Sequence, residues 1–106
     1  MSNQRSQPRI AFEAEVELVL ENGDKQKGRL TNISSGGTFV LTAPPPPFGT
    51  KVNLLVHLPG IPDRCAIPCI VRWTKGDDGA GLQFEHLRAL EMWAINRLKR
   101  DEAEAE

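Results

Sequence analysis

The most restrictive feature of this sequence is a two-residue alternation of apolar and polar side chains that recurs along most of its length. It is clearest in residues 12–21, where the apolar residues Phe12, Ala14, Val16, Leu18 and Leu20 alternate with Glu13, Glu15, Glu17, Val19 and Glu21. Because successive side chains of a β-strand point to opposite faces, this pattern predicts a strand with one buried face and one acidic face in water. Such a chain is expected to fold mainly into β-sheet.

Turn-forming residues divide the first 85 residues into six short segments of this kind. The expected strands span about 12–21, 26–33, 38–42, 51–58, 65–73 and 80–85, with Asn-Gly, Gly-Gly or proline-rich segments between most of them. Short strands at nearly regular intervals are typical of a closed or nearly closed antiparallel barrel. The predicted fold class is therefore mainly β, a six-stranded antiparallel β-barrel.

The spacing of apolar residues changes after Glu85, and the new spacing predicts a C-terminal α-helix. The apolar stripe consists of Leu87, Leu90, Ala94 and Leu98, widened by Met92, Trp93 and Ile95. We expect this stripe to pack on the barrel, with Trp93 in the core. The expected organisation is a flexible basic arm at 1–11, the barrel and its helix at 12–100, and a frayed acidic tail at 101–106.

Length and charge exclude several classes of protein. A chain of 106 residues provides one domain, and a net charge of −1 argues against a strongly basic nucleic-acid coat protein. No apolar stretch is long enough for a membrane span or a signal peptide, so we expect a cytoplasmic protein without membrane insertion. Cys65 and Cys69 share one face of a predicted strand and are expected to be buried thiols.

Residue combinations typical of catalysis are missing. His57 and His86 have no cluster of metal-ligating residues beside them, so neither a metal nor a cofactor is expected. Glu13, Glu15 and Glu17 share a strand face, and a solvated surface explains them better than an acid–base site does. The phosphate-binding loop pattern and the GxGxxG pattern are both absent from the sequence. The sequence therefore predicts a protein that is not an enzyme.

Two segments carry groups suited to an anionic ligand. The first runs from Arg5 to Arg9 and places two guanidiniums on the arm. A guanidinium binds phosphate oxygens or the edge of guanine in bidentate fashion, and it also stacks on a base. Two arginines on one arm could therefore hold both parts of a guanine nucleotide.

The second segment is Asn32-Ile33-Ser34-Ser35-Gly36-Gly37. Asn32 and Ser34 are expected to project together for hydrogen bonding, while Ile33 enters the core. Gly36 and Gly37 permit positive φ and let a ligand approach the backbone closely. The alternative interpretation is a glycine-closed hairpin turn that the Ser34 side chain caps.

Together the two segments resemble the PilZ domains, which are bacterial receptors for cyclic di-GMP. The family pattern is RxxxR followed further along the chain by [D/N]xSxxG. Arg5 and Arg9 match its first part, and Asn32, Ser34 and Gly37 match its second part. The resemblance continues through GTF, FGTKVNLLVHLP, VRW and GAGLQFEHL, so it covers nearly the whole chain.

The resemblance implies a stand-alone cyclic di-GMP receptor with a PilZ-type barrel. The implied ligand-binding residues are Arg5, Arg9, Asn32, Ser34, Gly36 and Gly37, to which Gln4, Arg72 and Trp73 are added, although Trp73 fits the core face of its strand equally well. The resemblance also implies that the arm closes over the ligand. The changed surface would then regulate a separate, unidentified bacterial protein in motility, attachment or related behaviour.

Two other functions are open to a chain of this kind. One is a nucleotide-independent protein-interaction module of type IV pilus or motility machinery, which would use the prolines at 44–47 and the outer surface. The other is a single-stranded nucleic-acid binder, since small barrels often have that role. The even charge balance and the presence of only four Phe, two Trp and no Tyr argue against nucleic acid as a partner.

Overall fold

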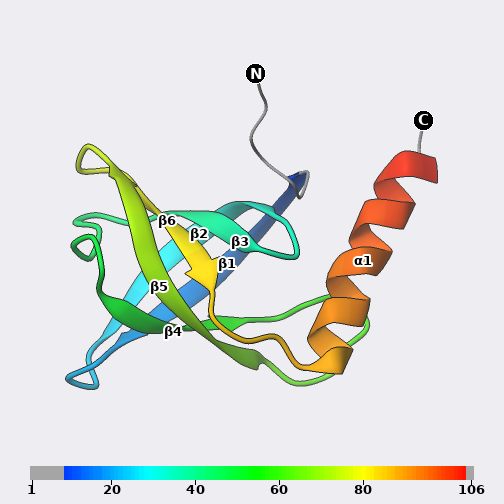
Figure 1. Cartoon of the computed structure of the whole chain (residues 1–106), viewed down its shortest axis with the longest axis horizontal. Helices are drawn as coiled ribbons and strands as arrows, with labels where there is room; N and C mark the ends of the chain where they lie inside the picture. The colour runs from blue at the N-terminus through cyan, green and yellow to red at the C-terminus, as the bar shows by residue number, and fades with distance from the viewer. Residues whose placement is uncertain (1–8, 105–106) are drawn as a thin grey trace.

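The computed structural model describes the backbone of residues 9–104 and the side chains of residues 9–98. It contains six strands followed by one helix, as the sequence predicts. The elements are β1 (Ile10–Leu20), β2 (Lys25–Ile33), β3 (Gly37–Leu41), β4 (Lys51–Val56), β5 (Cys65–Lys75), β6 (Gly79–Phe84) and α1 (Ala89–Glu104). The strands wrap into one barrel, and α1 stands beside it (Figure 1).

The barrel is closed and every strand pair in it is antiparallel. The strand order is β1-β2-β3-β6-β5-β4, and β4 pairs back onto β1 through partners such as Leu18 and Leu54. Hairpins join β1 to β2, β2 to β3 and β5 to β6, whereas the proline-rich segment carries the chain from β3 across to β4. This arrangement confirms the predicted fold class.

The core fills the inside of the barrel with alternate residues of each strand. The inward side chains of β4 are Val52, Leu54 and Val56, and those of β1 include Val16 and Leu18. On β5, the two cysteines point inward as free buried thiols, which confirms their prediction. Burial raises the pKa of the Cys69 thiol to about 12, so this group stays protonated and apolar at neutral pH.

The ends of the barrel differ from the expected boundaries in two places. Ile10 and Ala11, expected in the arm, belong to β1 and pair with Ile33 and Asn32. Ile10 is buried, and that burial favours its strand conformation over a free arm. At the other end α1 continues to Glu104, so residues 101–104 of the expected tail are helical.

The buried face of α1 agrees only in part with the predicted apolar stripe. Ala94 and Ile95 are buried, and Leu87 and Leu98 pack against the core in part. Leu90, Met92 and Trp93 are exposed, and Trp93 is 42% accessible. The expectation that Trp93 lies in the core was therefore wrong. Its ring packs over Gly60 and contacts the guanidinium of Arg97 at 5.4 Å from the ring centroid.

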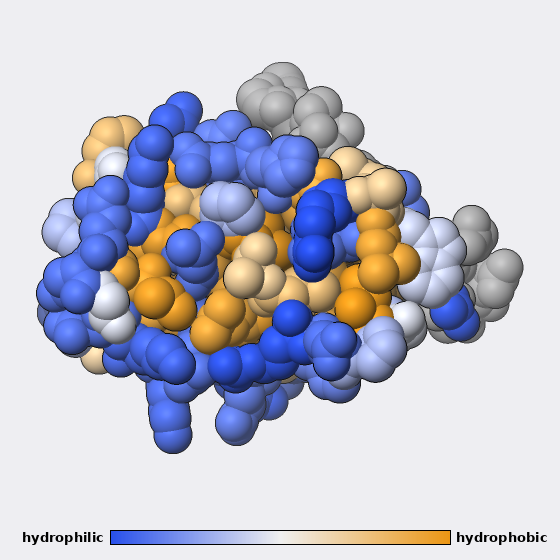
Figure 2. Space-filling model, turned by 90° about the horizontal axis from the view of Figure 1, so that it is seen from below, coloured by the Kyte–Doolittle hydropathy of each residue, from blue (hydrophilic) through white to orange (hydrophobic). Residues whose placement is uncertain are grey.

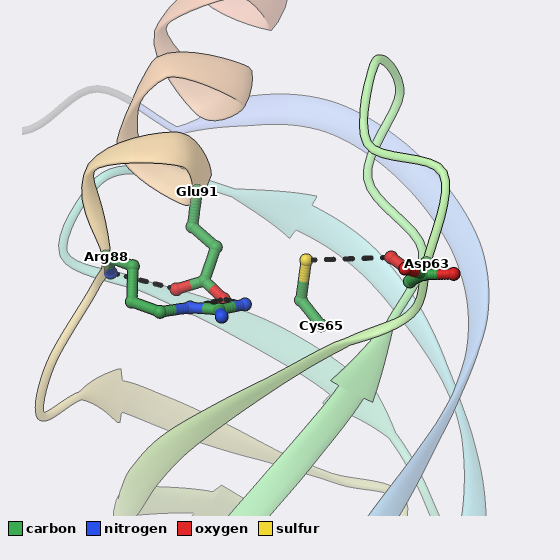
Figure 3. Close-up of polar contacts among 4 residues, drawn as sticks. All are labelled: Asp63, Cys65, Arg88 and Glu91. Carbon is green, nitrogen blue, oxygen red and sulfur yellow. Dashed lines mark hydrogen bonds and ion pairs between the residues drawn. The ribbon is translucent and has the colours of Figure 1, made fainter.

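A buried carboxylate in the first turn of the helix explains part of this difference from the predicted face. Glu91, in the first turn of α1, is only 1% exposed. Its Oε1 accepts a hydrogen bond from the backbone N–H of Arg88 at 2.9 Å, and its Oε2 accepts from the Arg88 guanidinium at 2.6 Å (Figure 3). The first bond is half of a capping box, in which the third helical residue satisfies the N–H of the cap residue.

No helix within residues 9–104 has the length and apolar character needed to cross a bilayer.

Candidate functional site

The two sequence segments meet at one open groove on the outside of the barrel. The groove has a volume of about 310 Å³. Six of the residues predicted from the sequence line it: Arg9, Ser34, Gly36, Gly37, Arg72 and Trp73. Below, this depression is called the site groove. Gln4 and Arg5, which were also predicted, lie outside the described residues.

Arg9 reaches the second segment directly. It lies immediately before β1, and the pairing of Ala11 with Asn32 brings the start of β1 beside the end of β2. The Arg9 guanidinium donates a hydrogen bond of 2.9 Å to Oδ1 of Asn32. Asn32 does not itself line the site groove, but its side chain holds Arg9, which does. The two segments are joined before any ligand is present.

Ser34 organises the turn that closes the second segment. Its Oγ accepts hydrogen bonds from the backbone N–H groups of Gly36 and Gly37 at 3.1 and 3.2 Å, and its own N–H donates to the Gly37 carbonyl at 2.8 Å. The alternative interpretation of Ser34 as a turn cap is therefore confirmed. Ser34 also lines the site groove, so the turn that it caps presents its backbone to the groove in one fixed geometry.

Gly36 and Gly37 do not have the positive φ that we expected. The glycines with positive φ among the described residues are Gly23, Gly49, Gly60 and Gly76. Gly37 is required for a different reason, because a Cβ there would lie 2.2 Å from the carbonyl oxygen of Leu82 on the paired strand. Its missing side chain serves the close approach of β3 to β6 at the floor of the groove.

Trp73 lies on the outer surface because β5 contains a β-bulge. Val71 pairs with Leu82, and Trp73 pairs with Gly81, so two residues of β5 face one step of β6. The extra residue, Arg72, reverses the alternation. Val71 is therefore fully buried, whereas Trp73 is 45% exposed and lines the groove with Arg72. The interpretation of Trp73 as a core residue is wrong.

A second bulge gives Asn32 its orientation. Leu30 and Ile33 both point into the core although three positions separate them, and the pairing of β2 with β3 shifts between Leu30 and Asn32. Asn32 thereby leaves the inward set, as the sequence predicts, while Ile33 enters it. A hydrogen bond from the Thr38 hydroxyl to the Asn32 carbonyl fixes the backbone beside this bulge.

Residues of β6 complete the groove, and the sequence analysis missed them. Gly81 and Gln83 line it together with Leu82 and Phe84. Gln83 is exposed between the two buried residues Leu82 and Phe84, so the alternation of β6 already placed its amide on the outside. No signal near either motif marked this strand as their neighbour, since the β3–β6 pairing is a long-range contact.

The chemistry of the site groove suits an anion that carries a flat ring. Arg9 and Arg72 contribute two guanidiniums, and none of the residues that line the groove is an aspartate or glutamate. Trp73 adds an aromatic surface and Gln83 an amide for base edges. In the described part of the chain, no three acidic, cysteine or histidine side chains come close enough together to hold a metal ion.

A family model described as the PilZ domain matches residues 3–100 of the chain. Solved structures share its fold at low sequence identity. The Bacillus subtilis inhibitor of motility MotI/DgrA has a TM-score of 0.75 and 18% identity over 97% of this chain and 53% of its own. No curated protein sequence matches the chain.

Two structures described as complexes with cyclic di-GMP are also similar. The PilZ domain of Escherichia coli YcgR has a TM-score of 0.71 and 16% identity, over 97% of both chains. MrkH from K. pneumonia has a TM-score of 0.71 and 16% identity over 98% of this chain and 54% of its own. The chain therefore spans about half the length of the MotI/DgrA and MrkH chains.

Proposed function

The chain belongs to the PilZ domain family, and from this premise we propose that it is a cytoplasmic, non-enzymatic receptor for cyclic di-GMP. The observation that carries the proposal is the convergence of both motifs on one groove. Arg9 of RxxxR and Ser34, Gly36 and Gly37 of the second motif line the same depression, and Arg9 is hydrogen-bonded to Asn32.

In the proposed complex, charge and shape act on different parts of the ligand. The Arg9 and Arg72 guanidiniums bind the two phosphates or the O6/N7 edge of a guanine, where charge-assisted bidentate bonds are strongest. The exposed part of Trp73 stacks on a guanine, and the turn at residues 34–37 supports the sugar-phosphate ring. Arg5, with Gln4 beside it, supplies the remaining contacts from the arm.

The output of such a receptor is a changed surface. With Arg5 and Arg9 engaged on the ligand, the arm would close over the ligand and alter what a partner protein contacts. We propose that this partner acts in motility, attachment or related behaviour. The similarity to a protein described as an inhibitor of motility supports that choice.

Calorimetric titration with cyclic di-GMP tests the proposal, with GTP and cyclic di-AMP as controls. We expect saturable binding that requires guanine, with the molar ratio giving one ligand or two. Arg9→Ala removes charge-assisted hydrogen bonds and should weaken binding by about 10-fold to 100-fold. Arg29→Ala, which removes an arginine outside the groove, is the matched control. Absence of binding to the wild type, or equal affinity of Arg9→Ala, would refute the receptor or the arm contact respectively.

The second candidate is a nucleotide-independent interaction module, and exposed apolar side chains favour it. Phe48 follows the prolines of the β3–β4 connection and is 70% exposed, and Leu90 and Trp93 are exposed on α1. Figure 2 shows hydrophobic residues gathered in the middle of one face within a rim of hydrophilic residues. A pull-down in which the captured proteins were unchanged by cyclic di-GMP and by Arg5→Ala would support this candidate over the receptor.

A further inference from the structure

A single cross-strand row connects Asn32 to Trp73 on the outer surface of the barrel. Asn32 pairs with Phe39 on β3, Phe39 pairs with Gly81 on β6, and Gly81 pairs with Trp73 on β5. Residues directly opposite each other on one face are close enough for their side chains to interact. The two middle members, Phe39 and Gly81, therefore lie between a hydrogen-bonding residue at one end and an aromatic residue at the other.

Gly81 provides the space in which the Trp73 ring lies. A Cβ at position 81 would be 2.1 Å from Nε1 of Trp73, 2.3 Å from Cε2 and 2.7 Å from Cδ1. Three ring atoms at such distances mean that the indole lies directly against the bare backbone of β6. Any side chain at position 81 must push the ring away, because the backbone fixes the position of Cβ and all three ring atoms lie too close to it.

Phe39 holds the Trp73 ring through a stacked contact. The Phe39 and Trp73 rings are stacked, with centroids 5.1 Å apart and an angle of 21° between their planes. Phe39 points away from the barrel core, and yet it is buried. Its own ring covers Gly79, where a Cβ would lie 2.5 Å from Cζ. The two stacked rings thus lie over two glycines of β6, which restricts the motion of both rings.

We propose that Phe39 and Gly81 are positioning residues that hold Trp73 as a flat stacking surface for the base of the bound nucleotide. This inference rests on the function proposed above. Trp73 and Gly81 both line the site groove, so the position of the ring determines the width and shape of that part of the groove. A ring that is already fixed loses little conformational freedom when a base stacks on it.

The test uses the full chain with Trp93→Phe, which leaves Trp73 as its only tryptophan. Trp93 is similarly exposed but lies on α1, outside the site groove. In this background, Trp73→Ala should weaken cyclic di-GMP binding by about 10-fold to 100-fold, since base stacking contributes that much. Gly81→Ala should cause a similar loss. It should also shift the Trp73 fluorescence of the nucleotide-free protein to longer wavelength, because the displaced ring is more exposed to water.

The double variant separates positioning from a general disturbance of the barrel. Once Trp73→Ala has removed the ring, Gly81→Ala should cost no further affinity, so the two effects are not additive. Phe39→Leu keeps most of the apolar volume and removes the stacked ring. It should shift the same fluorescence and weaken binding several-fold even if Gly81→Ala fails to fold.

Each result decides the inference. An additive loss in the double variant, or unchanged Trp73 fluorescence in both Gly81→Ala and Phe39→Leu, would overturn it. If the Trp93→Phe protein and the wild type bind no cyclic di-GMP, the proposed function fails and the stacking role fails with it. The fluorescence of the nucleotide-free variants then still decides whether Phe39 and Gly81 hold the ring.

Discussion

The site groove and a second depression on the same barrel use their charged side chains in different ways. The second depression, here called the β1–β2 hollow, has a volume of about 200 Å³ and is lined by Glu15, Val16, Glu17, Lys27, Gly28 and Arg64. Arg64 forms an ion pair of 3.0 Å with Glu17, and Arg29 nearby forms one of 2.7 Å with Glu13. In the site groove, by contrast, two arginines occur with no carboxylate among the lining residues.

The difference indicates what a depression can bind. In the β1–β2 hollow, the charges neutralise one another, so an incoming anion would have to displace a carboxylate. The site groove brings together two guanidiniums, turn backbone and an aromatic ring, and its lining residues include no carboxylate. The Arg9 guanidinium donates a hydrogen bond to the neutral amide of Asn32, and Ser34 holds the turn. Electrostatic preorganisation of this kind favours binding of phosphate.

The largest effect is expected where the site groove depends on bare backbone. Gly37→Ala places a methyl group 2.2 Å from the Leu82 carbonyl oxygen, which the β3–β6 ladder holds in place. We expect the free energy of unfolding to fall by about 1–3 kcal/mol, the usual cost of overpacking. Urea denaturation measures it, with Ser35→Ala in the same turn as control. A Gly37→Ala protein as stable as the wild type would mean that the groove floor is not fixed by this contact.

A smaller effect extends the comparison to an ion pair in which the Glu91 carboxylate is buried and the Arg88 guanidinium is exposed. Burial raises the pKa of Glu91, but hydrogen bonds and charge from Arg88 outweigh it, so the pKa lies below its ordinary value of 4.5. The stabilisation from the charged form is therefore complete above about pH 4.5 and is lost as the pH falls through the folded-state pKa.

Glu91→Gln tests this sign. It should lower the unfolding free energy by about 1 kcal/mol at neutral pH, as loss of a helix cap does. The difference from the wild type should shrink in acid as the pH falls through the folded-state pKa of Glu91, below which both side chains are uncharged. Denaturant unfolding at neutral pH and in acid gives the comparison. A difference that stayed constant or grew in acid would contradict the lowered pKa.

The smallest effect is expected in the β1–β2 hollow. Arg64 and Arg29 are about half exposed, and exposed pairs contribute little because water and salt screen them. Arg64→Ala should change the unfolding free energy by no more than about 0.5 kcal/mol and leave cyclic di-GMP affinity unchanged. A loss of affinity comparable with that of Arg9→Ala would remove the distinction between the two depressions.

Strand β4 could be predicted from the sequence because its alternation is uninterrupted. Its inward residues repeat every second position from Val52 to Val56. The motifs also identified the turn at 34–37 and the groove residue Arg9. The sequence left two interpretations of Trp73 open, a ligand-binding residue and a core residue. It could not decide between them because a single inserted residue, Arg72, reverses the alternation of β5, and a period-two pattern contains no signal for such a bulge.

Two further errors have physical causes of the same kind. The helix stripe placed Leu90 and Trp93 inside, because apolar spacing alone does not account for a buried carboxylate such as Glu91, which accepts hydrogen bonds from the exposed guanidinium of Arg88. Gly37 was expected to matter because it permits a positive φ. In the structure it matters because a Cβ at this position would collide with the Leu82 carbonyl oxygen. Both depend on long-range contacts, which the residues near each motif do not specify.

Closure of the barrel also limits how another protein can recognise this domain. Partners often bind by adding a strand to an exposed sheet edge, where unpaired backbone groups offer a ready ladder. Here each of the six strands is paired on both sides over part of its length, and closed sheets reduce such edges. Main-chain pairing of that kind is therefore restricted to short stretches, such as residues 10–16 of β1, which pair with β2 alone. Specificity must come largely from side chains and from residues outside the sheet, so substitutions there can change the partner without disturbing the fold.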